Sequence, residues 1–476
     1  MSVVPGTVDT EQQPPMTVPL RHFLVALGFL LAGGVVGGVS VLGGIGPITA
    51  PGLSSLAHVH LLLAGWVCVT IMGAMTQFVP VWSGVELYSR RLATRQLQLV
   101  AVGLVGFVGG LLAGRLALIP VFGALMVVGF WVFAYNIAAT IRGVGQLATL
   151  DVTERHFLIA VGFFLLLTAA GLVLAVDLVV PILRATPIDR ADLVGAHATL
   201  AVFGAILTTV LGALFQLATM FTQTDLHGID HPLRRIVSVG YPVGVIALAS
   251  GRLLGPDIAG GRLLGVVGGG LVIAGVLAMS VILARRLFEA QVPWTPMLSR
   301  YAVLAPAMAL WALLTLPRWL RAPLAAETRF GAPGTVHLLG LGVIGFVVLG
   351  TVYHVVPFIV WVHRYSDRLG FEDVPMIDDL YSDRLARIDF ACFLGGTLLL
   401  VVSDLLATLP ESALGAGIGI GSGVDVARLV TTGAGLGGAA ILVGVVVFCL
   451  NVVSVLRTHS PHSVRAILFG TRRSEG

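Results

Sequence analysis

Long apolar stretches alternate with short polar segments along almost the whole chain. A helix that crosses the hydrocarbon core of a bilayer needs about 20 apolar residues at a rise of about 1.5 Å per residue. Twelve stretches meet this requirement, near residues 22–43, 53–81, 96–114, 118–141, 156–181, 193–222, 235–254, 262–284, 300–318, 334–361, 387–408 and 428–456. The pattern therefore predicts an all-α, polytopic membrane protein with twelve transmembrane helices.

Three of these predicted helices, the second, sixth and tenth, share one pattern of histidine and glycine. His58 and His197 are each followed by glycine at +7 and +15 and by glutamine at +19. His60 and His337 are each followed by glycine at +13 and by proline at +20. Because the pattern returns every four helices, we predict three pseudo-equivalent four-helix units.

The polar segments divide the chain and indicate its orientation. Residues 1–20 predict a disordered tail, 21–457 a membrane domain and 458–476 a cytoplasmic C-terminal tail. With the N-terminus in the cytoplasm, 19 of the 28 arginines fall on inner segments. This bias predicts a plasma-membrane protein with both termini in the cytoplasm. Acidic and basic residues alternate in the inner loop 363–386, which is either a docking surface for a partner or a solvated loop.

Composition supports a lipid environment and excludes some classes of function. Hydrophobic residues make up 57% of the chain and charged residues 11%, which is too few charges for a soluble protein of 476 residues. The net charge of +4 is too small to favour nucleic-acid binding. The cysteines Cys68, Cys392 and Cys449 lie far apart and show no metal-site spacing, and C-x-x-C-H, the attachment motif of c-type haem, is absent.

The repeated histidines are the candidate functional residues. Imidazoles inside a membrane are costly and mark sites of ligation, and neutral imidazoles suit haem iron or copper. His58 and His60 differ by about 200° around a helix. Either one is a ligand and the other is structural, or their helix stands between two sites. His354 lies about 25 Å deeper than His337 at helical rise, so we do not expect these two histidines to share a site.

The helix count, the three units and the histidines on predicted helices 2, 6 and 10 resemble subunit I of the haem-copper oxidases. The stretch VHLLGLGVIGFVVLGTVYHVVP, which contains His337, is similar to the C-family (cbb-type) oxidases and the nitric-oxide reductases. HLLLAGWVCVTIMGAMTQFVPVWSG, which begins at His60, also resembles the NnrS family of haem-containing membrane proteins. The resemblance implies a low-spin haem b held by His337 with His60 or His58.

The chain departs from the oxidase pattern at its catalytic ligands. Thr335 stands where the oxidases carry the high-spin haem ligand, and the predicted helix 235–254 lacks their histidine pair. No tyrosine follows His197 one turn later, where the chain has Ala201. The resemblance therefore implies electron transfer through a bis-histidine haem, with an electron-donor protein or a partner subunit. His197, with His58, is left for a second haem or a copper ion.

Two other functions remain open. A non-enzymatic NnrS-like protein that handles haem or copper, or that responds to nitric oxide, would account for the missing catalytic ligands. A transporter on the same scaffold would need carboxylates near the middle of the membrane. Its candidates are Asp177 and Asp404, both near helix ends.

Overall fold

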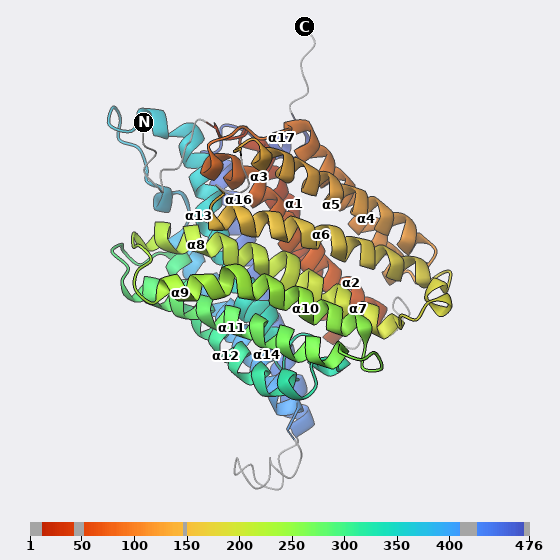
Figure 1. Ribbon diagram of the computed structural model, residues 1–476. Coiled ribbons are helices and arrows are strands. Elements are labelled where there is room, and N and C mark those ends of the chain that lie inside the picture. Colours follow the sequence, from red (N-terminus) through yellow and green to blue (C-terminus); the bar gives the residue numbers. More distant parts are fainter. Residues whose placement is uncertain (1–11, 42–51, 146–149, 410–425, 471–476) are drawn as a thin grey trace.

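The computed structural model describes residues 12–41, 52–145, 150–409 and 426–470. Twelve helical segments in this part of the chain are long and apolar enough to cross a membrane, and no β-strand occurs in it (Figure 1). The prediction of an all-α membrane protein with twelve spans is confirmed. The predicted spans agree with the observed helices to within about six residues at each end.

The spans follow one another in three groups of four. Unit 1 contains α1 (Thr17–Val41), the continuous α2–η3–α3 (Leu53–His60, Leu61–Cys68 and Val69–Ser83), α4 (Arg90–Leu112) and α5 (Leu118–Arg142). Unit 2 contains α6 (Val152–Asp177), α7–η6–α8 (Arg190–Thr199, Leu200–Leu207 and Thr208–Thr222), α9–η7–α10 (Asp230–Arg235, Ile236–Gly240 and Tyr241–Leu254) and α11 (Gly261–Phe288). Unit 3 contains α12 (Pro296–Arg321), η9–α13 (Leu338–Gly345 and Phe346–Arg364), α14 (Asp383–Ala407) and α16 (Val426–His459).

The two ends of the described chain lie on the same side of the helix bundle. Helix α1 begins at Thr17, inside the predicted tail, and residues 1–11 of that tail lie outside the described residues. The predicted C-terminal tail contains a short helix, α17 (Val464–Phe469). Arg21 Nε donates a hydrogen bond to the carbonyl of Ile467 at 2.6 Å, which joins the start of α1 to α17.

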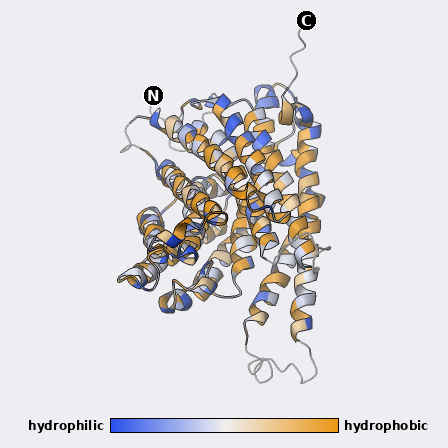
Figure 2. Ribbon diagram, turned by 90° about the vertical axis from the view of Figure 1, so that its right-hand side faces the viewer, coloured by the Kyte–Doolittle hydropathy of each residue, from blue (hydrophilic) through white to orange (hydrophobic). Residues whose placement is uncertain are grey.

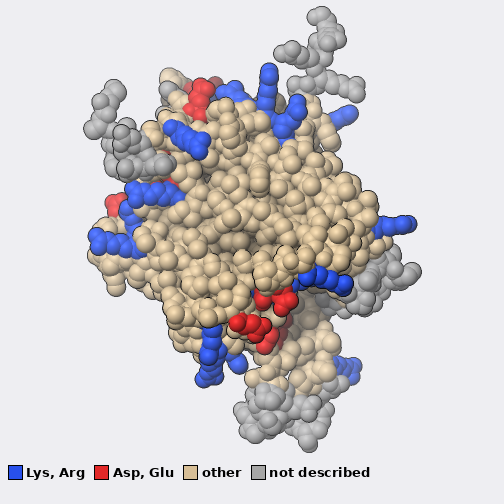
Figure 3. Space-filling view, turned by 45° about the vertical axis from the view of Figure 1, so that its right-hand side comes forward, with Lys and Arg blue, Asp and Glu red and all other residues tan. Residues whose placement is uncertain are grey.

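Polar residues gather near the ends of the spans, where a membrane protein meets water. Figure 2 shows apolar residues along the middle of the helices and hydrophilic residues mainly near their ends. In Figure 3 the charged side chains surround a broad area that carries none. This distribution fits a bilayer around the bundle.

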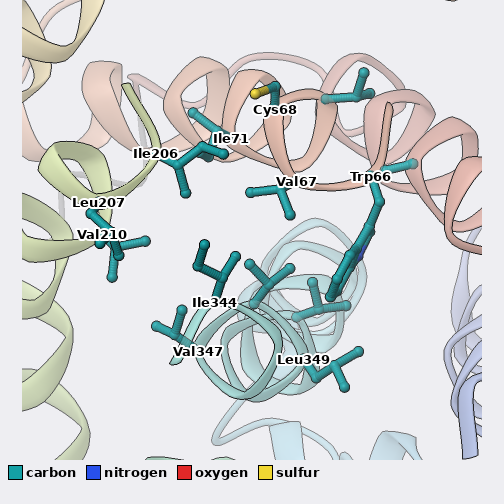
Figure 4. Packing of buried hydrophobic residues seen from close by; sticks show 14 of the residues in the cluster. Trp66, Val67, Cys68, Ile71, Ile206, Leu207, Val210, Ile344, Val347 and Leu349 are labelled. Atoms are coloured by element: carbon teal, nitrogen blue, oxygen red, sulfur yellow. The ribbon is translucent and has the colours of Figure 1, made fainter. Parts of the chain in front are cut away.

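The three repeated helices, α2–η3–α3, α7–η6–α8 and η9–α13, form the centre of the bundle. The most apolar windows of these helices are 67, 78 and 83% buried, whereas the other nine reach at most 61%. Figure 4 shows side chains of all three turned toward a shared space, among them Val67, Ile206 and Ile344. The helices that carry the histidine pattern are therefore also the core of the fold.

Each repeated helix contains eight residues of π-helix, the segments η3, η6 and η9 defined above. Each π segment begins directly after the same position of the repeat, which is His60, Thr199 or His337. A π-turn adds one residue to an α-turn and so rotates the helix by about 100° relative to an uninterrupted α-helix. The hydrophobic pattern alone does not predict these segments.

Glycines at repeated positions let the first helix of each unit approach its repeated helix. A Cβ added at Gly65, Gly204 or Gly342 would meet, respectively, Phe29, Phe163 or Ala307. A Cβ added at Gly73, Gly212 or Gly350 would meet His22, His156 or Arg300. Within each unit the two residues met on the first helix are seven positions apart: His22 and Phe29, His156 and Phe163, and Arg300 and Ala307. The repeat therefore extends to the first helix of every unit. Close approach of this kind is how helices associate in lipid.

A second repeated contact joins the third and fourth helices within unit 1, and it occurs again within unit 3. Asn136 Oδ1 accepts the backbone N–H of Ser89 at 3.0 Å, and Asn136 Nδ2 donates to the Ser89 carbonyl at 3.1 Å. Asn451 makes the same pair of bonds with Ser382, at 2.9 and 3.0 Å. Both serines are N-caps of the third helix of their unit. The predicted three-unit organisation therefore appears in specific side-chain contacts.

Replacement of Gly268 by alanine is expected to destabilise the protein. A Cβ there would press on the backbone of α10, at Leu248 N and at 2.7 Å from Gly244 O. Overpacking of this kind costs about 1–3 kcal/mol. We expect Gly268→Ala to lower the melting temperature in detergent, and Gly270→Ala, whose Cβ would meet nothing within 4 Å, to leave it unchanged. Equal melting temperatures for the two variants would contradict the packing described.

Candidate functional site

The repeat defines two polar positions at one end of each repeated helix. Position one is occupied by His58, His197 and Thr335, and position two by His60, Thr199 and His337. Position two directly precedes the π segment in all three units, and position one lies two residues earlier. The candidate residues named from the sequence therefore occupy four of six equivalent positions.

The four histidines come from all three units, and His58 and His197 each lie near enough to a histidine of another unit to feel its charge. His58 of unit 1 lies within electrostatic reach of His337 of unit 3. His197 of unit 2 lies within electrostatic reach of His60 of unit 1. His58 and His60 of α2 therefore each lie near a histidine of a different unit. Their roles as ligands, and the choice of partner for His337, stay predictions.

In all four histidines, Nδ1 is engaged by an oxygen. The acceptor is the carbonyl of Gly33 for His58, of Leu56 for His60 and of Leu167 for His197, each at 2.8 Å. No described residue forms a hydrogen bond with Nε2 of these side chains. A proton held on Nδ1 leaves the lone pair on Nε2, which is the tautomer that binds a metal.

His337 has the strongest acceptor of the four, because its Nδ1 lies 2.6 Å from Oδ2 of Asp404. Helix α14 carries Asp404, which is 67 residues away in sequence, so the sequence did not suggest the contact. A carboxylate behind an imidazole fixes its orientation and raises its basicity as a ligand. Asp177, the other carboxylate considered for a transporter, pairs instead with Arg190 at 2.6 Å.

Glycine makes room for the imidazole at position one in units 1 and 2. A Cβ at Gly37 would meet the ring of His58, and a Cβ at Gly171 would lie 2.9 Å from Cε1 of His197. The equivalent residue of unit 3 is Thr315, which accepts a hydrogen bond from the backbone N–H of Ala332 at 3.2 Å. In unit 3 threonine therefore replaces both the glycine and the position-one histidine.

At the boundary between units 2 and 3, a buried arginine joins the two units. Arg252 is 3% exposed and donates to Thr199 Oγ1 at 2.8 Å. It also donates to the carbonyls of Pro323, Thr328 and Arg329, at 2.8–3.2 Å. These bonds tie position two of unit 2 to the segment that precedes position one of unit 3.

Aromatic side chains also pack at the boundary between units 2 and 3. Phe203 of unit 2 lies 5.6 Å from Trp311 and 5.4 Å from Trp319 of unit 3, measured between ring centroids. All three side chains are buried, and the indole N–H groups of both tryptophans donate to backbone carbonyls. The arginine and the aromatic rings therefore fill the boundary between units 2 and 3 at the level of positions one and two.

Other polar residues of the bundle lie away from these sites. His354 packs against Phe221 and Phe358, with ring centroids 4.3 and 5.9 Å away, as expected for a histidine that does not share a site with His337. The observed seventh span begins at Asp230 and so includes His231, which is exposed in its first turn. It does not supply the missing histidine pair of the oxidases.

Sequence reasoning missed His22 and His156, which are equivalent residues of α1 and α6. Each is 1% exposed, and Nε2 of each has no hydrogen-bond partner in the described part of the chain. In unit 3 the same position is Arg300, which forms a buried ion pair with Asp389. The signal was present in the sequence, because both histidines precede the position-one histidine of their units on the preceding helix.

A cavity of about 70 Å³ lies on the axis between the three repeated helices. Thr70, Thr209 and Val347 are equivalent residues and line it, with an almost entirely apolar surface. A cavity of this size holds a few water molecules at most. Its lining contains no His, Cys, Asp or Glu side chain.

The number of available imidazoles bears on the kind of metal group that the histidines could hold. Within the described ranges, no cluster of three or more His, Cys, Asp or Glu side chains is positioned to hold a metal ion. A bare zinc or copper ion in a protein site takes about three or four protein ligands. Iron in a porphyrin needs only two axial ligands, so two imidazoles with unoccupied Nε2 atoms match haem.

No model of a known protein family matches the chain, and no curated protein is significantly similar to it. The resemblance to oxidase subunit I therefore rests on this chain's own residues. Those residues are the spacing of the repeat and the histidines at positions one and two.

Replacement of Arg252 by leucine is expected to destabilise the contact between units 2 and 3. The change removes the donors to Thr199 Oγ1 and to three backbone carbonyls, and leaves these acceptors buried. A buried acceptor that is left without its donor costs about 1–3 kcal/mol. Thermal unfolding in detergent measures the effect. Arg262→Leu is the control because Arg262 is exposed, and an equal melting temperature for both variants would contradict the assignment.

Proposed function

We propose that the protein binds haem and transfers electrons within the membrane, with His58 and His337 as the axial ligands of a b-type haem. The observation that carries the proposal is the pair itself. The two imidazoles come from neighbouring units, Nδ1 of each is engaged by an oxygen, and Nε2 of each has no partner among the described residues.

The protein's own residues orient the ligands and hold the protons. The Gly33 carbonyl and the Asp404 carboxylate keep a proton on Nδ1 of His58 and His337. The haem would supply reversible one-electron chemistry. Imidazoles on both axial sides leave no open position for oxygen or nitric oxide, which favours electron transfer over substrate turnover.

The membrane orientation is part of the proposal. The arginine bias favours cytoplasmic termini in the plasma membrane, and the two described ends lie on one side of the bundle. The histidine pairs lie toward the opposite side, near the starts of α2 and η9. We infer that an electron-donor protein or a partner subunit reaches them from outside the cell.

The proposal predicts a haem that depends on both residues of the pair. We expect the full-length protein, purified from haem-replete cells, to show the reduced spectrum of a low-spin bis-histidine haem. His58→Ala and His337→Ala should each remove the same haem. His354→Ala should retain it, because His354 packs against Phe221 and Phe358 away from the pair. Purified protein without haem, or haem content unchanged in both variants, would refute the proposal.

Asp404 is expected to tune this haem without binding it. Asp404→Asn weakens the acceptor for Nδ1 of His337 and so makes the imidazole a poorer donor to oxidised iron. We expect a more positive reduction potential and haem affinity about 10–100-fold lower, as is usual when a partner of a ligand is changed. A redox titration and haem transfer to apomyoglobin measure the two effects. Asp177→Asn, which changes a carboxylate near another helix end, should alter neither.

A non-enzymatic role in handling copper is the second candidate. It is favoured because residues that would serve oxidase catalysis are replaced. Position one of unit 3 is Thr335, and buried Arg252 occupies the boundary between units 2 and 3. Copper in the purified protein without haem would favour this function. Turnover of oxygen or nitric oxide by the pure protein would count against it.

A further inference from the structure

The cavity on the axis of the bundle lies in a different part of the repeated helices from the histidines. Every residue of these helices that lines it comes after the π segments, beginning at Thr70, Thr209 and Val347. Positions one and two precede the π segments. Ile71, Val210 and Val347 lie around the same space, one from each repeated helix (Figure 4). The cavity is therefore separate from the proposed haem site.

Small side chains in one layer of the core leave this space. Ala74, Ala213 and Thr351 occupy one position of the repeat, and all three line the cavity. One turn later the same helices carry larger buried side chains, which are Phe78, Leu217 and Val355. Protein interiors are otherwise closely packed, and side chains that face a void lose the dispersion contacts of a filled core. A molecule that enters the cavity would supply those contacts.

The cavity is unsuited to water. A buried water molecule needs about two to four polar partners, and the surface of this cavity is almost entirely apolar. Thr209 Oγ1 already donates to the carbonyl of Ala205 at 2.7 Å. Thr351 Oγ1 donates to the carbonyl of Val347 at 2.7 Å and lies 2.9 Å from the hydroxyl of Tyr301. An apolar cavity of this kind stays dry and takes up small apolar molecules such as xenon.

Aromatic side chains bound the cavity where it extends away from the axis. Phe78 and Trp82 on α3 and Phe157 on α6 line this part. The ring of Trp82 is stacked between the other two, with its centroid 4.8 Å from that of Phe78 and 6.0 Å from that of Phe157. A volume of about 70 Å³ admits a molecule of a few heavy atoms and is too small for a lipid chain or a planar cofactor.

We propose that the cavity binds one small, uncharged, apolar molecule, of the class that includes dioxygen and nitric oxide. Apolar molecules leave water for an apolar environment, so gases of this class enter the bilayer and reach the bundle from it. Binding replaces empty space beside Ala74 and Ala213 with dispersion contacts. The site does not depend on the proposed haem, because it shares no residue with the histidine positions.

Xenon tests whether the cavity takes an apolar atom. We expect one xenon atom between Ala74, Ala213 and Thr351 in crystals of the full-length protein exposed to xenon gas. Ala213→Leu fills the space and should lose the xenon, with a melting temperature in detergent at or above that of the wild type. Thr209→Val is the matched control and should retain xenon, because the hydroxyl that it removes is bonded to Ala205.

Two results would overturn the proposal at this stage. One is the absence of xenon from the wild-type cavity, and the other is retention of xenon in Ala213→Leu. If Ala213→Leu does not fold, Ala74→Val adds less volume to the same layer and should lower the occupancy of xenon. Unchanged occupancy in a folded Ala74→Val variant would contradict the site.

A measurement in solution identifies the gas. Dioxygen and nitric oxide are both paramagnetic, so a bound molecule speeds the relaxation of nearby methyl groups. We expect each gas, tested separately, to raise the relaxation rate of the Met75 methyl several-fold more than that of Met279. Both side chains are buried, but only Met75 lines the cavity. Equal effects on the two methionines with both gases, or ordered water in the cavity, would overturn the proposal.

Discussion

The fold depends on the close approach of helix backbones at glycine. Lipid offers helices no hydrophobic driving force for association, so contact surfaces must fit at short range. Gly65, Gly204 and Gly342 occupy one position of the repeat, and at each the first helix of the unit lies where a Cβ would be. The repeated helices can therefore meet on the central axis while their units wrap around them. Positions one and two then lie at one end of these central helices.

Much of this arrangement was predictable from the sequence, because its signals are local. Apolar stretches predicted the twelve spans, and the spacing of histidine, glycine and proline predicted the three units. The 200° between His58 and His60 already allowed two sites. Two sets of contacts were not predictable, because they join residues far apart in the sequence. His337 and Asp404 are 67 residues apart, and Arg252 lies 53 residues from Thr199 and 71 from Pro323. The π segments were also missed, because their hydrogen bonding leaves no separate hydrophobic period.

The three units have diverged in what they place between them. Units 1 and 2 keep an imidazole and its glycine at position one, whereas unit 3 has Thr335 and Thr315. The units also differ at the opposite end of the bundle. Nε2 of His22 and of His156 has no hydrogen-bond partner among the described residues, whereas Arg300, at the same position of unit 3, pairs with the buried Asp389. Unit 3 therefore has bonded polar groups, Thr335 and Arg300, where units 1 and 2 have histidine, although it has His337 at position two. A repeat can keep its packing while the chemistry between its units changes.

The position of His58 and His60 two residues apart on α2 means that a ligand of one histidine would affect the other. Their side chains project in directions about 200° apart, so a rotation of α2 moves both imidazoles at once. A ligand bound by His58 would therefore also restrict the ring of His60 and its contact with Phe107. By linkage the effect would be reciprocal, so a contact that holds the ring of His60 in place would raise the affinity of His58 for its ligand.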